Sequence, residues 1–315
     1  MRALVVHIGE GSTHILLATT RRQDLQVQVG RRRANFLQSL GGPEEEERHD
    51  HLYVMHDQQV RNGADLSLLY LAQLKPDLRE ALLHQAVEAV QHFKDMPEVV
   101  NVAISSSLLQ HPAKPTDDPV VAAFQEQTGL KLRVLDPEDE ALWMLRGVRG
   151  IYPAGELACA QVGHWRTLGA WERPGRVPRL NSWPAGVNRP PEILGKSLFP
   201  DLGAPAGRPL YVTGELAWLT AALQIGLTFH DMDLLDETVL DDQSLDKLWF
   251  LLESLSVEQR DMIPMTGHQG DCLPGALRLL RQLRKESGAE QLQVCSRGVV
   301  HGLASHLFYE GRRAD

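Results

Sequence analysis

The chain has 315 residues, of which 43% are hydrophobic and 23% are charged. This composition excludes a disordered chain, and the length exceeds one compact core and predicts two domains. The formal net charge of −9 excludes a positive field over the whole molecule, so a polyanion would have to bind a local patch.

A β-hairpin is predicted at the start of the chain. Two apolar, β-rich runs, 3–8 and 13–18, flank the turn Gly9-Glu10-Gly11-Ser12. Glycine gives the backbone freedom that a tight turn needs. An acidic stretch follows at 41–51, where Gly-Gly-Pro precedes four glutamates, and we interpret it as a solvated loop or linker.

Helices and strands then alternate through the first half. Asp77 and Glu80 match a capping box before an apolar series at helical spacing. Asp118, Pro119 and Gly129 match the N-cap, first-turn proline and C-terminal glycine of a second helix. The predicted elements are a helix to about residue 94, a strand over 99–104, the helix bounded by 118 and 129, and a strand over 132–135.

The second half repeats this order. Asp136-Pro137 opens a helix through Gly147, and a second hairpin follows around the turn Gly163-His164-Trp165-Arg166. Residues 172–209 are rich in Gly, Pro and Arg and predict a long connection. Further predicted elements are strands over 157–162, 168–171, 210–212 and 292–295, helices from about 215, near 243–255 and over 273–286, and a final helix. Two halves that each begin with a hairpin indicate an α/β protein built from a duplicated unit.

Cysteine spacing and hydropathy set expectations for the compartment. Cys159, Cys272 and Cys295 form no C-x-x-C pair, so we expect reduced, buried thiols rather than a zinc site or disulfides. The first apolar run is too short for a signal-peptide core and no stretch approaches a membrane span, which favours a cytoplasmic protein without a membrane partner. Arg31-Arg32-Arg33 is interpreted as solvated surface, so no nucleic-acid partner is expected.

Segments in both halves carry a family resemblance. The stretches are V-V-H-I-G-E-G-S at 5–12, I-S-S-S-L at 104–108, V-L-D-P-E-D-E-A at 134–141 and Q-V-G-H-W-R-T at 161–167. In the same order they resemble the A-[IV]-D-[IL]-G-S-N-S, T-S-A-L-R, V-L-S-G-E-E-E-A and D-I-G-G-G-S-T segments of the exopolyphosphatase/guanosine pentaphosphate phosphohydrolase (Ppx/GppA) family.

The resemblance continues to the C-terminus. The stretches are S-W-P-A-G-V at 182–187, V-T-G at 212–214, L-P-G-A-L at 273–277 and V-C-S-R-G-V-V-H-G at 294–302. They are similar to the family's S-L-P-L-G-A-V, its glycine-rich strand end before a helix, L-P-G-A-L and V-S-D-R-G-L-R-E-G. Nearly the whole chain except about 35–75 is covered, and the match is to the family's short form without a C-terminal helical extension.

The resemblance implies a two-lobed, actin-like (ribonuclease H-like) duplicated α/β fold with a cleft between the lobes. One lobe would comprise 1–137 and 299–315, and the other 138–298. The implied activity is release of a terminal phosphate from polyphosphate or pppGpp, with magnesium as cofactor. The expected ligand is therefore a phosphate-containing small molecule or polyphosphate, and a homodimer is left open.

The resemblance also implies site residues. Glu140 would position or deprotonate the attacking water, although acidic residues at 138–140 equally suit a helix N-terminus. The candidate phosphate-binding residues are Gly9, Gly11 and Ser12 in the first hairpin, Gly163 and Arg166 in the second, and Gly214.

Several family positions carry residues unsuited to phosphate or magnesium. His7 and Gln161 replace aspartates, and an imidazole and an amide are poor ligands for a hard cation. The other changes are Leu109 for an arginine, His164 and Trp165 for glycines, and carboxylates at Glu10 and Glu215. A like-charge pair at 4 Å costs on the order of 4 kcal/mol at an effective dielectric of 20, so the carboxylates would repel phosphate.

These changes predict a catalytically impaired protein that binds a ligand or partner. An active phosphohydrolase with Glu140 as base and Arg166 as clamp is the main alternative. Two weaker ones are a transition-metal site of His7, His14 and His164, and a nucleotide phosphotransferase, for which no Walker-type loop is present.

Overall fold

The computed structural model describes residues 2–9, 12–19, 52–61, 84, 87–88, 90–92, 99–106, 119–130, 132–187, 197–200, 202, 207–228, 232–236, 238–264, 266 and 269–313. Most of the helix expected up to residue 94 lies outside the described residues. The loop 41–51, the arginine run 31–33 and the residues Glu10, Gly11 and Leu109 lie outside them as well.

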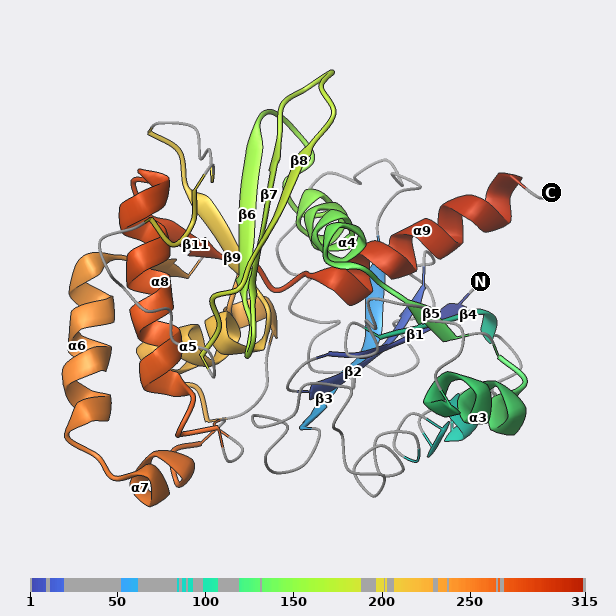
Figure 1. Cartoon of the computed structure of the whole chain (residues 1–315), viewed down its shortest axis with the longest axis horizontal. Coiled ribbons are helices and arrows are strands. Elements are labelled where there is room, and N and C mark those ends of the chain that lie inside the picture. The colour runs from blue at the N-terminus through green and yellow to red at the C-terminus, as the bar shows by residue number, and fades with distance from the viewer. Residues whose placement is uncertain are drawn as a thin grey trace, which may run out of the picture. The chain divides into compact units, whose positions relative to one another are not determined.

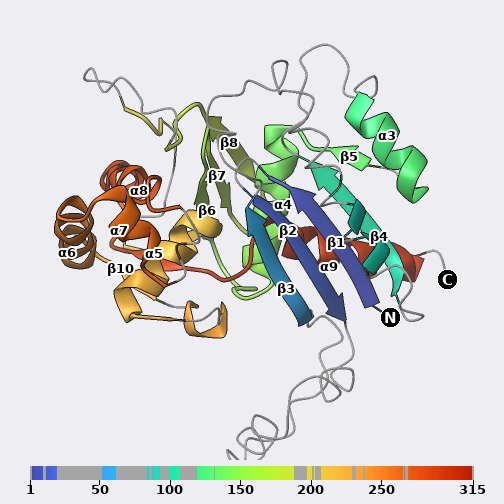
Figure 2. The same cartoon turned by 90° about the horizontal axis from the view of Figure 1, so that it is seen from below.

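The first unit is a five-stranded mixed sheet (Figure 2). Its elements are β1 (Arg2–Ile8), β2 (Ser12–Thr19), β3 (Tyr53–Arg61), β4 (Val99–Ser106), α3 (Pro119–Thr128) and β5 (Leu132–Val134). The strand order is β3-β2-β1-β4-β5, with β1 and β3 antiparallel to β2, and β4 parallel to both β1 and β5. Both β1 and β2 are almost continuously buried, as expected for apolar strands within a sheet.

The second unit is built on a six-stranded sheet of order β10-β11-β9-β6-β7-β8 (Figure 1). Its strands are β6 (Leu157–Val162), β7 (Thr167–Glu172), β8 (Arg179–Trp183), β9 (Leu210–Thr213), β10 (Val239–Leu240) and β11 (Leu292–Val294). Its helices are α4 (Pro137–Arg149), α5 (Glu215–Ile225), the 3-10 turn η5 (Met232–Leu234), α6 (Asp242–Glu253), α7 (Val257–Asp261), α8 (Leu273–Ser287) and the start of α9 (Val299–Arg313). Helices α5, α6 and α8 lie on one side of the sheet and α4 on the other.

The two sheets share one topology, which confirms the predicted duplication. The order β8-β7-β6-β9-β11 repeats β3-β2-β1-β4-β5, with the same two antiparallel and two parallel pairings. The extra strand β10 extends the second sheet beyond β11. Strand β8 lies inside the stretch 172–209 that was predicted as a connection, and β3, β10 and α7 were not predicted at all.

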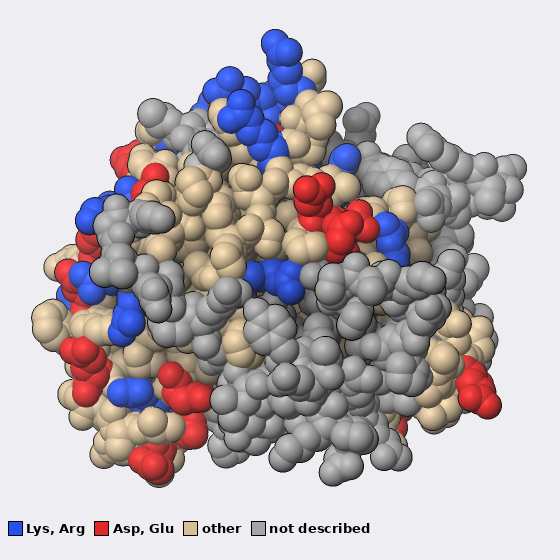
Figure 3. Space-filling model, in the orientation of Figure 1, with Lys and Arg blue, Asp and Glu red and all other residues tan. Residues whose placement is uncertain are grey.

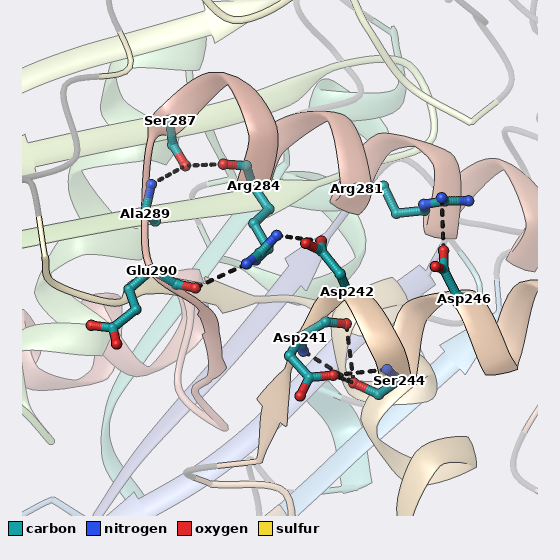
Figure 4. A network of polar contacts seen from close by, with 9 residues as sticks. All are labelled: Asp241, Asp242, Ser244, Asp246, Arg281, Arg284, Ser287, Ala289 and Glu290. Atoms are coloured by element: carbon teal, nitrogen blue, oxygen red, sulfur yellow. Dashed lines mark hydrogen bonds and ion pairs between the residues drawn. The ribbon is translucent and has the colours of Figure 1, made fainter.

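Leucines and a polar network hold α6 against α8. The buried leucines of α6, Leu245, Leu248 and Leu252, lie three to four positions apart and face the core. Figure 4 shows the polar contacts beside them. Arg284 of α8 pairs with Asp242 and donates from Nη2 to the Glu290 carbonyl at 3.1 Å, while Arg281 pairs with Asp246 at 2.7 Å. Exposed pairs of this kind add little stability singly, so the leucines contribute more.

Glycines allow α4 and the start of α9 to cross at backbone contact. A Cβ added at Gly147 would lie 2.1 Å from the Gly298 carbonyl oxygen, and one at Gly302 would lie 2.0 Å from the Trp143 carbonyl oxygen. Residues from Leu303 onward belong to the first unit, and 135–302 to the second. The division into lobes expected from the sequence, 1–137 with 299–315 and 138–298, stays a prediction.

The three cysteines are free and buried, as predicted. Burial raises the pKa of the Cys159 thiol well above its usual range and that of Cys295 to about 12. Within the described part of the chain, every helix is too short or too polar to cross a membrane.

Candidate functional site

The carboxyl ends of three parallel strands meet at one edge of the second sheet. Gln161 of β6 pairs in register with Thr213 of β9, whose neighbour on the other side is β11. Ligands of open α/β sheets bind at this edge, where loops leave the strands. The edge therefore places the segments after β6, β9 and β11 within reach of one another.

Gln161, Gly214 and Gly298 come together at this edge. Gly214 has φ 88°, and a Cβ there would lie 2.7 Å from the Gln161 side chain. The Thr213 hydroxyl donates to the Arg297 carbonyl at 2.7 Å, which fixes the turn after β11. Gly298 lies beside Thr213 and Gln161: a Cβ at this position would be 3.1 Å from Thr213 Oγ1 and 3.9 Å from Gln161 Oε1. An amide thus stands where the resemblance implies an aspartate.

The turn between β6 and β7 is closed by a backbone hydrogen bond, and the segment after β8 packs against its backbone. The Gly163 amide donates to the Arg166 carbonyl at 2.9 Å, and the Gly163 carbonyl accepts from Val187 at 3.2 Å. A Cβ at Gly186 would lie 2.4 Å from the His164 carbonyl oxygen, so these backbones touch. The turn is therefore held in place by backbone contacts, with Arg166 half-buried.

His164 packs toward the start of α8. Its imidazole is 8% exposed, and Nδ1 lies 3.9 Å from the Sγ atom of Cys272. Cys272 is the N-cap residue of α8 and is itself 5% exposed. This contact joins residues far apart in the sequence, and no local signal predicts it.

A carboxylate occupies the N-terminal end of α5. Gly214 is the N-cap residue and offers no capping side chain, and Glu215 is the first helical residue. The Gln269 amide donates from Nε2 to Glu215 Oε1, and the Gln269 side chain is 3% exposed. A helix N-terminus attracts anions, and at the start of α5 the anion is the carboxylate of Glu215.

Glu140 is buried in the first turns of α4. Asp136 caps this helix, because its side chain accepts the Asp139 amide at 2.7 Å, and Pro137 occupies the first turn. Glu138 is exposed and Asp139 half-buried, whereas Glu140 is 4% exposed. The three acidic residues therefore differ in solvent exposure, and Glu140 is the only one of the three that is buried.

In the first unit, the β1–β2 hairpin closes as predicted. The Gly9 amide donates to the Ser12 carbonyl at 2.9 Å, and Ser12 is half-buried. His7 and His14 lie directly opposite each other on the two strands, and both are buried. Gly11, the remaining candidate of this hairpin, lies outside the described residues.

Neither position that the resemblance links to a metal offers a good magnesium ligand within its own unit. His7 of the first unit offers an imidazole and Gln161 of the second an amide, whereas Mg²⁺ prefers carboxylates, phosphates and water. Among the residues that the structure describes, no three His, Cys, Asp or Glu side chains are arranged to hold a metal ion. His7 pairs with His14, while His164 packs on Cys272.

No protein-family model matches the chain, and no curated protein sequence is significantly similar to it. Solved structures of similar fold do match over the full length. The Ppx/GppA family member of Aquifex aeolicus has a TM-score of 0.72 at 14% identity, covering 99% of this chain and 98% of that one. An exopolyphosphatase from Cytophaga hutchinsonii has a TM-score of 0.73 at 13% identity, with 98% of each chain covered. The chain therefore has the two-lobed, actin-like fold of the Ppx/GppA phosphatases, as the sequence predicted.

Proposed function

We propose that the chain is a Ppx/GppA-like protein with strongly impaired phosphohydrolase activity, which acts by binding a ligand or a partner. The fold and the ordered motifs support the relationship. The paired Glu215 and Gln269 at the start of α5 are the observation on which the loss of activity rests.

Electrostatics explains why this pair opposes catalysis. Phosphoryl transfer needs positive charge, metal and backbone donors around the developing negative charge. Glu215 places a carboxylate at a helix end that would otherwise favour phosphate, and Gln161 offers a neutral amide at the neighbouring strand end. Both changes weaken binding of a phosphate chain and of the metal that neutralises it.

The test measures phosphate release from polyphosphate and from pppGpp with magnesium. We expect the wild-type protein to be no faster than Glu140→Gln. The matched control is Glu138→Gln, which removes an exposed carboxylate from the same helix turn. Release that is lost in Glu140→Gln but kept in Glu138→Gln would overturn the proposal.

A second experiment tests the role of Glu215 directly. Glu215→Gln keeps the size of the side chain but removes the charge at the start of α5. We expect calorimetry to show affinity for inorganic tripolyphosphate about tenfold higher than in the wild type. Unchanged affinity, with Glu138→Gln as the charge-matched control, would show that Glu215 does not oppose the ligand.

The burial of Glu140 favours the second candidate function, an active phosphohydrolase. Acidic residues that merely favour a helix N-terminus are ordinarily solvated, as Glu138 is. Glu140 is 4% exposed, so a preference for the helix N-terminus does not account for its burial, whereas a carboxylate that positions the attacking water would be enclosed in this way. Arg166 and backbone amides of the β6–β7 turn would then bind phosphate, and the phosphate-release experiment separates the two candidates.

A further inference from the structure

The loop that joins β7 to β8 carries a concentrated basic surface. Arg173, Arg176 and Arg179 lie in this loop or at its end, and all three are exposed. Arg208 is exposed as well and lies nearby, because its Nη1 atom donates to the carbonyl of Glu156, the residue that pairs with Arg173. Figure 3 shows Lys and Arg side chains gathered at the end of the molecule where β7 and β8 are joined in Figure 1. No acidic residue occurs from 173 to 187, although the chain as a whole has a net charge of −9.

A rigid turn displays these arginines. The Arg176 amide donates to the Arg173 carbonyl at 3.0 Å, and Gly175 has φ 72°. Proline at the second position and a positive-φ glycine at the third are typical of a type II turn, and Pro178 stiffens the return. A preformed loop loses less conformational entropy on binding than a mobile one.

Trp171 fixes the orientation of two guanidinium groups. The guanidinium carbons of Arg173 and Arg179 lie 4.3 and 5.1 Å from the centroid of the Trp171 ring. Glu156 accepts from Trp171 Nε1 at 2.8 Å and from Arg173 Nε at 2.7 Å. Stacking uses the flat face of a guanidinium group and leaves N–H donors on its edge. Glu156 offsets part of the positive charge of Arg173 and of Arg208, so Arg176 and Arg179 provide most of the remaining positive charge.

An exposed aliphatic side chain lies among these arginines. Val177 is 89% exposed and directly follows Arg176. Tryptophan and arginine are enriched in protein–protein hot spots, and Val177 adds exposed apolar area beside them. A long polyanion such as duplex DNA would also approach the rest of a molecule with a net charge of −9, whereas a short acidic segment responds to charges within about 10 Å.

We propose that Trp171, Arg173, Arg176, Val177, Arg179 and Arg208 form a docking surface for an acidic segment of a partner protein. Carboxylates of the partner accept hydrogen bonds from the guanidinium edges, where bidentate geometry is available. An apolar residue beside those carboxylates packs on Val177. This role is independent of phosphate binding at the strand ends of the second sheet.

The test uses a fluorescein-labelled peptide of repeated Glu-Glu-Leu units, titrated with the full chain and followed by fluorescence anisotropy. We expect saturable binding that weakens about tenfold or more in Arg173→Gln/Arg176→Gln/Arg179→Gln and a few-fold in Val177→Ser. A Gln-Gln-Leu peptide should not bind. The matched control is Lys247→Gln/Arg278→Gln/Lys285→Gln, which removes the same charge from exposed positions of α6 and α8 and should leave binding unchanged.

Four outcomes would overturn the proposal. The first is that the peptide does not bind. The second is that the control triple variant weakens binding as much as the loop variant. The third is that duplex DNA or polyphosphate binds as tightly as the peptide and that Val177→Ser does not change this binding. Arginine-dependent self-association in sedimentation velocity would instead assign the surface to a second copy of this chain. Circular dichroism of both triple variants shows whether the fold is retained.

Discussion

The β1–β2 hairpin of the first unit and the β6–β7 hairpin of the second unit close alike but are supported differently. In each, a glycine amide donates to the carbonyl three residues later at 2.9 Å, from Gly9 to Ser12 and from Gly163 to Arg166. Two residues before each glycine, at the positions where the resemblance implies an aspartate, the chain has His7 and Gln161. The turn of the second hairpin is in backbone contact with Gly186, whereas a Cβ at Gly9 would come closer than 3.4 Å only to the Ser12 carbonyl oxygen among the residues that the structure describes.

The backbone closure of the two turns does not depend on the residue type two positions before the glycine. Both hairpins have the backbone closure that a phosphate loop uses, with a histidine or a glutamine beside it in place of an acidic residue. The fold therefore constrains the backbone independently of the phosphate chemistry. In the second hairpin that constraint comes from close packing against Gly186, so an alanine at Gly186 should cost more stability than an alanine at Gly9 in the first hairpin.

The largest expected effect is that of Gly186→Ala. The new Cβ would lie 2.4–2.5 Å from backbone atoms of His164 and Trp165, which cannot move without opening the β6–β7 turn. Overpacking of this kind should lower the free energy of unfolding by about 3 kcal/mol. Urea unfolding followed by tryptophan fluorescence measures the change. A loss of unfolding free energy below about 0.5 kcal/mol would show that the backbone around Gly186 shifts easily to accommodate the new methyl group.

Gly214→Ala should have the next largest effect, about 2 kcal/mol. Alanine is strained at φ 88°, and its Cβ would lie 2.7 Å from the Gln161 side chain. The two causes separate in a double-mutant cycle with Gln161→Ala, because removing the amide relieves the clash but not the backbone strain. Additive losses in the cycle would mean that the contact with Gln161 contributes nothing.

Local patterns in the sequence predicted most elements of the second unit. Strand β6 was expected at 157–162, and α8 was expected over 273–286, because alternation, capping and helical periodicity are local signals. Strand β8 was missed because its Gly-, Pro- and Arg-rich flanks resemble a loop. The pair Glu215–Gln269 and the backbone contact at Gly186 were missed because both depend on segments that meet through tertiary packing.

Glu286 gives the segment that packs on β8 a pH-dependent anchor. Its carboxylate accepts from the amides of Leu198 and Phe199 at 3.0 and 2.8 Å, and Phe199 packs edge-to-face on Trp183 of β8. Desolvation by burial raises the pKa of Glu286, but the hydrogen bonds from Leu198 and its neighbours outweigh it, so the pKa of Glu286 is lowered.

A carboxylate with a lowered folded-state pKa stabilises the fold above its unfolded pKa, near 4.3, and loses that contribution as pH falls through the folded value. Glu286→Gln should therefore lose about 1 kcal/mol at pH 7, and the difference from the wild type should shrink below pH 4. Urea unfolding across pH 3 to 7 measures it. The exposed Glu253→Gln is the control and should show no such convergence. A difference that stays constant with pH would rule out the charge as its origin.

Gly9→Ala should have the smallest effect, and it completes the comparison of the hairpins. A Cβ at Gly9 would lie 3.2 Å from the Ser12 carbonyl oxygen and 3.7 Å from the His7 ring, so a shift of a few tenths of an ångström accommodates it. Alanine also restricts the unfolded chain, which offsets part of the strain. We expect a change within about 0.5 kcal/mol in urea unfolding. A loss as large as that of Gly186→Ala would mean that the first hairpin is held as tightly as the second, and that its closure does not depend on the hydrogen bond between Gly9 and Ser12 alone.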